Sequence, residues 1–493
     1  MNKLTLHGIS NIAILYTGIG IGFLNTILKA KVLTVEEIGV ISIITTIAML
    51  AVYFINLGVP SGLKKYYGAY RDRISNKTGL VLISFGLPSV VCIVMSGLFL
   101  LFKQRVIHYF NNPLLSYYIN YIYLFFLGNM FIEVFRAVFQ SEFKSVQANL
   151  IYDSVWRVLN LIFLVLLLLI DIAFYYYFIF IITGLFLRVV LFVSVFLTKV
   201  QIGRPSLKEF NIDFFKRFSV YSFFMFFAGM AGLITNSVDK IMIGHYISVG
   251  AVGIYTIAST FAVLIRTIGK GFSHIAHPLI SEYWIKGATD SIKRVYRENV
   301  NVQLLIGIYV FIVLFVFSSP ILKYLGKDYV KGEGVLIMLA FGELINLATG
   351  MCGGIIAYSK DYRFDFLLRF LLVIASIALN LIFIPRWGLN GAAFATALSL
   401  ALYNIIKLIF VRIRFRMQPY SIESLKILVL GISTGVCLYF VNLKLFHITG
   451  IGMSIFISIA FFSLYTGAGL IIFRINSIEK GILKIKKMIT KMT

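Results

Sequence analysis

Several arginine and lysine side chains occur inside long apolar stretches of this chain of 493 residues. A charged side chain at the centre of a membrane-length apolar helix costs about 2.5–3.5 kcal/mol, so it normally faces a cavity or a partner. Arg157 lies four residues after Asp153, the spacing of an ion pair on one helix face. Arg266 and Lys270 have this spacing but the same sign, and Arg188 has no acidic residue within two helical turns. We therefore expect an anionic group to meet these cations.

One carboxyl group, that of Glu343, stands nearly alone in the middle of an apolar stretch. Desolvation favours its neutral form, so it is a candidate for taking up and releasing a proton; the alternative is a fixed partner for an arginine. The sequence has three cysteines, Cys92, Cys352 and Cys437. They lie in apolar stretches and share no metal-ligand spacing, so neither a metal site nor a disulfide framework is expected.

Composition identifies the elements that must position these residues. The chain is 60% hydrophobic and 13% charged, about half of the roughly 25% charged residues of soluble domains, which excludes a soluble enzyme. Apolar runs of about 20 residues, each long enough to cross a bilayer as a helix, recur along nearly the whole length. We predict an all-α integral membrane protein with about 14 transmembrane helices, near 9-28, 38-57, 80-102, 117-135, 150-170, 173-197, 218-238, 251-270, 301-322, 335-356, 366-384, 391-411, 425-442 and 450-473.

The formal net charge of +25 is explained by membrane topology rather than by nucleic acid. With both termini cytoplasmic, the inside loops hold roughly 30 Lys and Arg and the outside loops roughly 10, as the positive-inside bias requires. The partner of this charge is the anionic lipid bilayer. The longest predicted loop, near 271-300, leaves no room for a separate soluble domain.

An internal repeat suggests two halves. Residues 33-44 align without gaps on residues 247-258, and eight of the twelve positions are identical or conservative. Both segments enter the second helix of a six-helix half, so the halves are expected to have parallel orientation. The predicted organisation is an N-terminal lobe at 1-212, a C-terminal lobe at 213-416, two further helices at 417-475 and a basic amphipathic cytoplasmic tail at 476-493.

The order of several short motifs resembles one known family. Asp239-Lys240, Gly244 and Gly253-Ile254-Tyr255 are similar to the D-K-x-x-x-G…G-I-Y signature of Wzx-type polysaccharide and O-antigen flippases, which transport lipid-linked oligosaccharides. Further matching stretches are Glu37-Ile38-Gly39, Leu57-Gly58-Val59-Pro60, Leu379-Asn380-Leu381, Ile384-Pro385 and Gly388-Leu389-Asn390-Gly391-Ala392-Ala393. The likeness covers nearly the whole chain.

The family belongs to the multidrug, oligosaccharidyl-lipid and polysaccharide exporter superfamily. The resemblance implies two pseudo-symmetric six-helix lobes around a central cavity that opens alternately to the two sides of a bacterial inner membrane. It implies transport of an oligosaccharide on undecaprenyl pyrophosphate for surface polysaccharide synthesis, without enzymatic activity or a cofactor. A polysaccharide polymerase and the chain-length machinery are the further partners that it suggests.

In such a flippase, an arginine suits pyrophosphate because its planar guanidinium makes two charge-assisted hydrogen bonds at once. We therefore expect a receiving surface for the pyrophosphate that is formed by Arg188, Arg266, Lys270 and Arg157. Two alternatives to pyrophosphate binding remain open. Arg157 could instead form a structural ion pair, and Lys270 could extend to the lipid headgroups.

The coupling ion is left open between Na⁺ and H⁺. The related lipid II flippases use helices 7, 11 and 12 for a sodium site, which corresponds here to Asp239, Asn380 and Thr396, with Glu343 as the proton candidate. This chain has no second carboxylate beside Asn380, which places sodium binding in doubt. Asp239 also lies at a helix end, where a capping role is the alternative.

Three other functions are alternatives to a polysaccharide flippase. A drug antiporter of the same superfamily needs mainly acidic residues in its cavity, whereas the unpaired charges here are basic. A lipid II flippase shares the architecture and is separated only by the signature residues. A membrane glycosyltransferase requires catalytic acids on a large loop or a D-x-D metal motif, and the sequence has neither.

Overall fold

The computed structural model describes residues 3–445 except 71, 171, 202, 206–211 and 236, together with six positions between 456 and 467. Every regular element in these residues is helical. Eleven of the described helices are long and apolar enough to cross a membrane, so the chain is a multi-pass membrane protein. The run predicted at 450-473 lies largely outside the described residues, and the tail at 476-493 lies wholly outside them.

The chain divides into two compact units, Met1–Thr256 and Ile257–Thr493. The predicted lobe boundaries at 212 and 416 stay a prediction. The first unit contains α1 (Lys3–Val32), α2 (Val35–Asn56), α3 (Val59–Tyr70), α4 (Ile74–Phe110), α5 (Pro113–Tyr118), α6 (Ile122–Ser141), α7 (Ser145–Asn149), the π-helix η2 (Leu150–Ser154), α8 (Val155–Leu169), α9 (Phe174–Lys199), α10 (Ile212–Thr235), α11 (Val238–Tyr246) and the start of α12 (Val249–Ile285).

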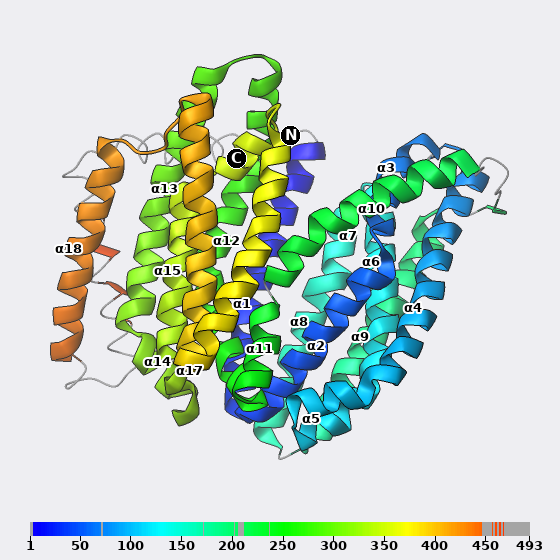
Figure 1. Ribbon diagram of the computed structural model, residues 1–493, viewed down its shortest axis with the longest axis horizontal. Helices are drawn as coiled ribbons and strands as arrows, with labels where there is room; N and C mark the ends of the chain where they lie inside the picture. The colour runs from blue at the N-terminus through cyan, green and yellow to red at the C-terminus, as the bar shows by residue number, and fades with distance from the viewer. Residues whose placement is uncertain are drawn as a thin grey trace. The chain divides into compact units, whose positions relative to one another are not determined.

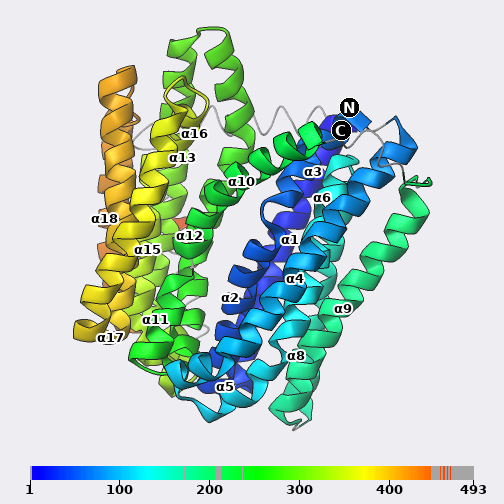
Figure 2. The same ribbon diagram turned by 45° about the vertical axis from the view of Figure 1, so that its right-hand side comes forward.

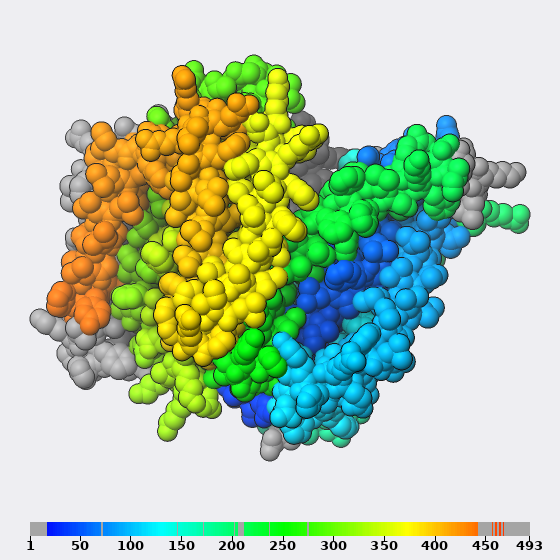
Figure 3. Space-filling view, in the orientation of Figure 1, coloured from blue at the N-terminus to red at the C-terminus, as the bar shows by residue number. Residues whose placement is uncertain are grey.

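Helix α6 is the centre of the first unit, because it packs against α2, α3, α4 and α9. Figure 1 shows these helices grouped together, Figure 2 shows α8 and α9 side by side, and Figure 3 shows α10 lying across α2 and α3. In contrast, α4 exposes large apolar side chains such as Ile93 and Leu101. Such a helix is stable only where lipid covers its outer face.

Helix α2 begins with a capping box, in which the Thr34 hydroxyl accepts a hydrogen bond from the Glu37 backbone and the Glu37 carboxylate accepts one from the Thr34 backbone. This cap occurs in the first copy of the predicted repeat. It explains why the helix starts at Val35.

The two copies of the repeat contact each other in a reciprocal way inside the first unit. The hydroxyls of Ser42 and Thr256, which are equivalent positions 214 residues apart, share a hydrogen bond of 2.8 Å. Gly39 of α2 lies against the carbonyl of Val249, and its equivalent Gly253 lies against the carbonyl of Val35. In this pair of contacts, the glycine of each copy packs against the equivalent carbonyl of the other copy. A twofold axis produces this pattern. The two copies of the repeat therefore pack against each other in the structure.

Substituting Gly39 or Gly253 with Ala is expected to force the two segments apart, because the added Cβ has no room beside the opposite carbonyl oxygen. Overpacking of this kind costs about 1–3 kcal/mol. Thermal unfolding in detergent measures it, and the two variants should be equally destabilised. Gly86→Ala in α4 is the matched control, because a Cβ there meets nothing within 4 Å. If Gly39→Ala is as stable as the control, the close contact is contradicted.

A buried ion cluster connects α3 and α4 to the residue that follows α6. Glu142 accepts hydrogen bonds from the Tyr67 hydroxyl at 2.6 Å and from the Lys77 ammonium at 3.2 Å. The Lys77 side chain is only 6% exposed, so it depends on this carboxylate. Burial by itself would raise the pKa of Glu142, but the hydrogen bonds from Tyr67 and Lys77 outweigh it and hold the pKa below its ordinary value of 4.5.

This lowered pKa predicts the pH dependence of stability. The contribution of Glu142 is fully present above the ordinary value of 4.5 and is lost as the pH falls through the lower pKa of the folded state. Glu142→Gln is expected to lower the free energy of unfolding at neutral pH by about 1–3 kcal/mol, because it removes a charge-assisted hydrogen bond. Melting temperatures of both proteins between about pH 3 and 7 should converge at the acidic end. A constant difference would contradict the assignment.

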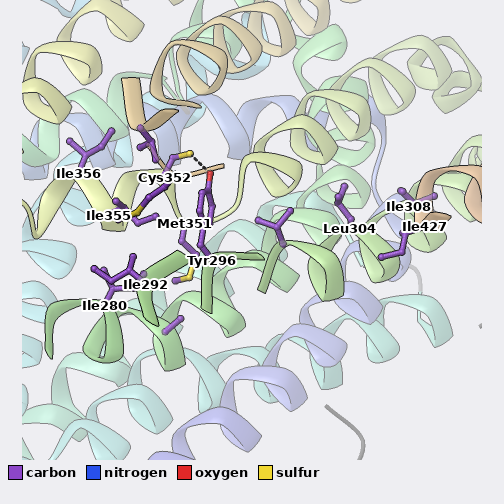
Figure 4. Packing of buried hydrophobic residues seen from close by; sticks show 14 of the residues in the cluster. Ile280, Ile292, Tyr296, Leu304, Ile308, Met351, Cys352, Ile355, Ile356 and Ile427 are labelled. Carbon is purple, nitrogen blue, oxygen red and sulfur yellow. Dashed lines mark hydrogen bonds between the residues drawn. The ribbon is translucent and has the colours of Figure 1, made fainter. Parts of the chain in front are cut away.

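The second unit contains the rest of α12, then α13 (Thr289–Val316), α14 (Ser318–Leu325), η3 (Lys327–Gly332), α15 (Glu333–Thr349), α16 (Cys352–Ala357), α17 (Tyr362–Phe415) and α18 (Ile422–Leu445). Helix α13 packs against α15 and α18, and α17 packs against α15 and α16. Their core includes Tyr296, whose hydroxyl contacts the Cys352 thiol (Figure 4). The cysteine therefore has a packing role here.

Two sequence predictions about this unit can be compared with the structure. Helix α17 covers both predicted runs, 366-384 and 391-411, and a kink at Gly388 divides it. Gly388 has a φ of 58°, which favours glycine, and Pro385 precedes the kink. The predicted loop at 271-300 was wrong, because α12 continues to Ile285 and α13 begins at Thr289. Polar helices extend beyond the apolar runs there, which hydropathy alone does not reveal.

Candidate functional site

Two of the predicted cations, Arg188 and Lys270, form no ion pair with a carboxylate among the described residues. Arg188 lies in α9, half-buried, with its guanidinium 4.9 Å from the centre of the Trp156 ring. Its Nε donates to the Gly184 carbonyl at 3.3 Å, and its Nη1 donates to the Tyr152 carbonyl at 3.4 Å. These bonds are long, and the positive charge is not neutralised by them. Arg188 is thus held in place without a direct ion pair, and the Asp153 carboxylate attracts it only from a longer distance.

The π-helix η2 supplies one of these contacts. Tyr152 and Asp153 lie in this wide turn between α7 and α8. A π-turn disrupts the regular i→i+4 ladder, and such turns are frequent at functional sites. The sequence predicted one continuous run at 150-170 and did not reveal the wide turn.

Arg188 lines a cavity of about 200 Å³ in the first unit. Its described lining holds a second cation, Lys29 of α1, and no aspartate or glutamate. The lining residues are Lys29, Ile41, Thr45, Met49, Phe125, Asn129, Tyr152, Trp156, Ile181, Leu185 and Arg188. Two cations, three aromatic rings and several polar groups therefore surround one space. Lys29 was not predicted as a site residue, because it follows the predicted run 9-28 and therefore falls in an outside loop.

Arg157 forms the predicted ion pair with Asp153, with Nε donating at 2.8 Å. Its Nη1 also donates to the carbonyl of Gly18 in α1, and a Cβ at Gly22 would crowd the guanidinium. Small residues of α1 therefore make room for this arginine. Because its charge is balanced, Arg157 has a more structural role than Arg188, the other arginine of this unit that was predicted for the site.

Arg266 has a carboxylate partner in the second unit. Its Nε donates to Glu343 at 2.6 Å, and the Glu343 side chain is 3% exposed. The two alternatives for Glu343 were a proton carrier and a fixed partner for an arginine; the structure contains the pair. Arg266 was expected to lack a counter-ion, and that expectation was wrong because 77 residues separate the partners. Lys270 is exposed.

Asp239 is buried in the first unit and carries two hydrogen bonds. The Tyr255 hydroxyl donates to it at 2.6 Å, and the Lys240 backbone amide donates at 2.8 Å. The two ends of the D-K…G-I-Y signature are thus bonded to each other. The contact with the first turn of α11 fits the capping alternative.

Asn380 and Thr396 lie in α17 of the second unit, and both are buried. Asn380 Oδ1 and Thr396 Oγ1 have no hydrogen-bond partner among the described residues. Neutral oxygens of this kind suit a hard cation, so they fit the residue types expected for sodium. Sodium binding stays a prediction.

A second buried ion cluster was missed by the sequence analysis. Asp365 accepts a hydrogen bond from Arg369 at 2.8 Å and lies 3.9 Å from the Lys407 ammonium. The side chains of Asp365 and Lys407 are each 8% exposed. The spacing of Asp365 and Arg369, four residues apart, is a signal that would have identified this pair.

Known structures share the fold of this chain. The fold resembles that of the lipid II flippase MurJ in an inward closed conformation, with a TM-score of 0.73 and 17% identity over 96% of this chain and 100% of that chain. It also resembles an inward-facing multidrug resistance MATE family transporter of the MOP superfamily, with a TM-score of 0.67 and 13% identity over 80% of this chain and 94% of that chain. The chain has the fold of MOP-superfamily transporters.

The family model described as Polysaccharide biosynthesis protein matches residues 6–284, which is more than half of the chain. The chain therefore belongs to this family, whose members are transporters and not enzymes. A second model, MatE, matches residues 214–383.

Three curated relatives carry names that point the same way. The probable low-salt glycan biosynthesis flippase Agl15 of Haloferax volcanii is 24% identical over 42% of this chain, and the probable flippase AglR of the same organism is 23% identical over 64%. The capsular polysaccharide biosynthesis protein CapF of Staphylococcus aureus is 21% identical over 38%. The matched stretches span 43%, 64% and 48% of these relatives' own lengths. All three names concern glycan or capsular polysaccharide biosynthesis, and the chain spans less than two thirds of the length of each of these relatives.

Proposed function

We propose that this protein moves undecaprenyl-pyrophosphate-linked oligosaccharides from the cytoplasmic to the outer leaflet by alternating access. The observation that carries the proposal is the half-buried Arg188, which lines a cavity of a membrane-spanning unit without a carboxylate partner among the described residues. A guanidinium in such a place without a direct ion pair is costly, and an anionic ligand would lower this cost. The proposed location is the bacterial cytoplasmic membrane, with both termini in the cytoplasm and the polymerase and chain-length machinery as partners.

The chemistry of Arg188 fits a diphosphate. A guanidinium presents several N–H donors in one plane, which matches pairs of phosphate oxygens. Its present acceptors are two carbonyls at 3.3 and 3.4 Å, which a charged ligand would outcompete. Trp156 holds the group in place from one side. In this proposal Arg188 binds the pyrophosphate first.

The other predicted cations have different parts in the proposal. Arg157 and Arg266 already have the carboxylates of Asp153 and Glu343, so the substrate has to displace these partners before binding. Lys270, which is exposed, attracts the headgroup by charge alone. Coupling to Na⁺ through Asp239, Asn380 and Thr396, or to H⁺ through Glu343, remains part of the proposal.

Reconstituted vesicles test the function directly. Purified protein in lipid vesicles should expose a labelled undecaprenyl-pyrophosphate oligosaccharide to a membrane-impermeant reagent faster than empty vesicles do. Lipid II and a fluorescent organic cation, tested in the same vesicles, distinguish the two other transporter functions. Transport of the organic cation alone would support a drug antiporter, and transport of lipid II alone would support a cell-wall flippase; either result overturns the proposal.

A further inference from the structure

A second cavity lies in the second unit, near the point where α12 ends. Its volume is about 380 Å³, within the roughly 300–1,000 Å³ that is typical of ligand pockets. Three segments line it: the last turn of α12, the residues between α16 and α17, and the end of α17. None of the lining residues has a part in the proposed transport mechanism.

Two cations line this cavity, and the single carboxylate of its lining is already bound to one of them. Arg414 Nε donates to one carboxylate oxygen of Asp361 at 2.8 Å, and Arg414 Nη2 donates to the other at 3.5 Å. This pair uses one edge of a guanidinium that has five N–H donors. Lys360 is exposed and forms no ion pair with a carboxylate of the described residues. The lining therefore has a surplus positive charge and unused donors.

Residues next to the cavity add to the positive charge. The segments 358-363 and 412-416 together contain five cations and one acidic residue. Three of these cations, Arg363, Arg412 and Arg416, are exposed and do not line the cavity. Clustered charge of one sign attracts ligands of the opposite sign. An anion is thus drawn to this end of the unit, and the cavity is where it can make direct contacts.

Hydrogen bonds fix the turn that carries Lys360. The Ser359 hydroxyl donates to the Ile356 carbonyl at 2.7 Å and accepts a hydrogen bond from the Asp361 amide at 3.0 Å. The backbone of Lys360 is therefore held beside the Asp361 carboxylate without the help of a ligand. A preformed site of this kind loses less conformational freedom when it binds.

Another part of the lining is aromatic and apolar. Trp284 Nε1 donates to the Ile355 carbonyl at 3.1 Å, and the Trp284 ring centre lies 5.2 Å from that of Phe415. Tyr358 and Ile285 also belong to the lining, and they are 43% and 85% exposed. Water disfavours such an exposed isoleucine, whereas an acyl chain packs against it. Tryptophan and tyrosine are typical of the membrane interface.

The length of α17 places the cavity at the depth of lipid headgroups. About 26 residues separate the kink at Gly388 from Arg414, which corresponds to about 40 Å of helix. A bilayer that includes its headgroup regions is about 40–45 Å thick. When the kink lies at one surface of the bilayer, Arg414 therefore lies among the headgroups of the other.

We infer that this cavity binds the headgroup of an anionic phospholipid. Lys360 and the second edge of Arg414 contact the phosphate, and the acyl chains leave the cavity over Ile285. A soluble anion explains the cations but not the exposed apolar side chain beside them. With both termini in the cytoplasm, this end of the unit faces the inner leaflet. The site is separate from the one that binds the transported substrate, so it does not rest on the proposed function.

Melting temperatures of the purified full-length protein in detergent test this site. Dioleoyl-phosphatidylglycerol is anionic, and dioleoyl-phosphatidylcholine has the same acyl chains but no net charge. The anionic lipid should stabilise the wild-type protein at lower concentrations than the neutral lipid does. Lys360→Gln should raise the concentration of anionic lipid that is needed by about tenfold, the effect of one charge-assisted hydrogen bond. The response to the neutral lipid should stay unchanged.

Two further variants distinguish a built site from general surface charge. Arg412→Gln removes an exposed arginine that lies close by in sequence but outside the lining, so the response to the anionic lipid should not change. Asp361→Asn removes the carboxylate that competes for Arg414, so less anionic lipid should be needed. If the pair of Asp361 and Arg414 were only structural, Asp361→Asn would lower the melting temperature without changing the response to lipid.

Four results would overturn the inference. Equal stabilisation by the two lipids excludes a preference for an anionic headgroup, and an unchanged response of Lys360→Gln removes Lys360 from the site. Equal effects of Arg412→Gln and Lys360→Gln assign the response to diffuse charge. Stabilisation by inorganic phosphate, at constant ionic strength and to the same extent as by phosphatidylglycerol, indicates a site for a soluble anion. None of these measurements involves transport, so the proposed function fails or stands independently.

Discussion

Replacing Arg188 with Gln is expected to slow the flipping of every undecaprenyl-pyrophosphate glycan by about tenfold to hundredfold, because it removes a charge-assisted contact with the shared diphosphate. The variant should still fold. Its amide nitrogen can donate to the Gly184 or Tyr152 carbonyl, and only the cation–π contact with Trp156 is lost. The initial rate in reconstituted vesicles is the measurement.

Two further substitutions separate charge from geometry at this position. Arg188→Lys keeps the charge but not the planar fork, so an intermediate rate is expected. Arg105→Gln in α4 removes another arginine that lies over an aromatic ring, Phe102, and should leave transport unchanged. A normal rate for Arg188→Gln, with both neutral and acidic glycans, would exclude Arg188 from the substrate site.

Replacing Glu343 with Gln is expected to lower the free energy of unfolding by about 1–3 kcal/mol, because Arg266 loses its carboxylate partner. The Glu343 side chain is 3% exposed, whereas that of Arg266 is 32% exposed, so water compensates part of the lost attraction. Thermal unfolding in detergent measures the change. The double variant Arg266→Met with Glu343→Gln should recover much of the stability, since both charges are removed together.

The same variant distinguishes the two alternatives for Glu343. If Glu343 carries a coupling proton, Glu343→Gln mimics its neutral form, and the transport rate should lose its dependence on pH while the protein stays stable. If the pair is structural, the loss of stability dominates and the double variant restores both folding and transport. A stable Glu343→Gln variant with unchanged pH dependence would contradict both alternatives.

Much of the fold could be predicted from local sequence. Apolar runs predicted membrane helices whose positions match α2, α9 and α18 closely. Their ends were less predictable: α12 extends to Ile285 through a polar segment that hydropathy assigns to a loop. The wide turn η2 was also missed, because its distinguishing feature is a backbone hydrogen-bond pattern rather than a composition.

The candidate site was predicted only in part. Arg188 was chosen as a cation without a nearby acid in sequence, and it forms no direct ion pair with the described residues, although Asp153 attracts it from a longer distance. Arg266 also has no acidic residue nearby in sequence, and yet its side chain pairs with Glu343 in the structure. Lys29 was not predicted, because it lies just after the apolar run 9-28, although it lines the same cavity as Arg188.

The amino-acid sequence alone determined that this chain crosses the membrane many times and that it carries the motif of a glycan flippase, because both properties depend on residues close together in the chain. Tertiary structure decided which buried charges are balanced. The Arg157 contact with Gly18 spans 139 residues, and that of Arg266 with Glu343 spans 77. The energy of a charge depends on the few ångströms around it, and helix packing brings distant residues into that space.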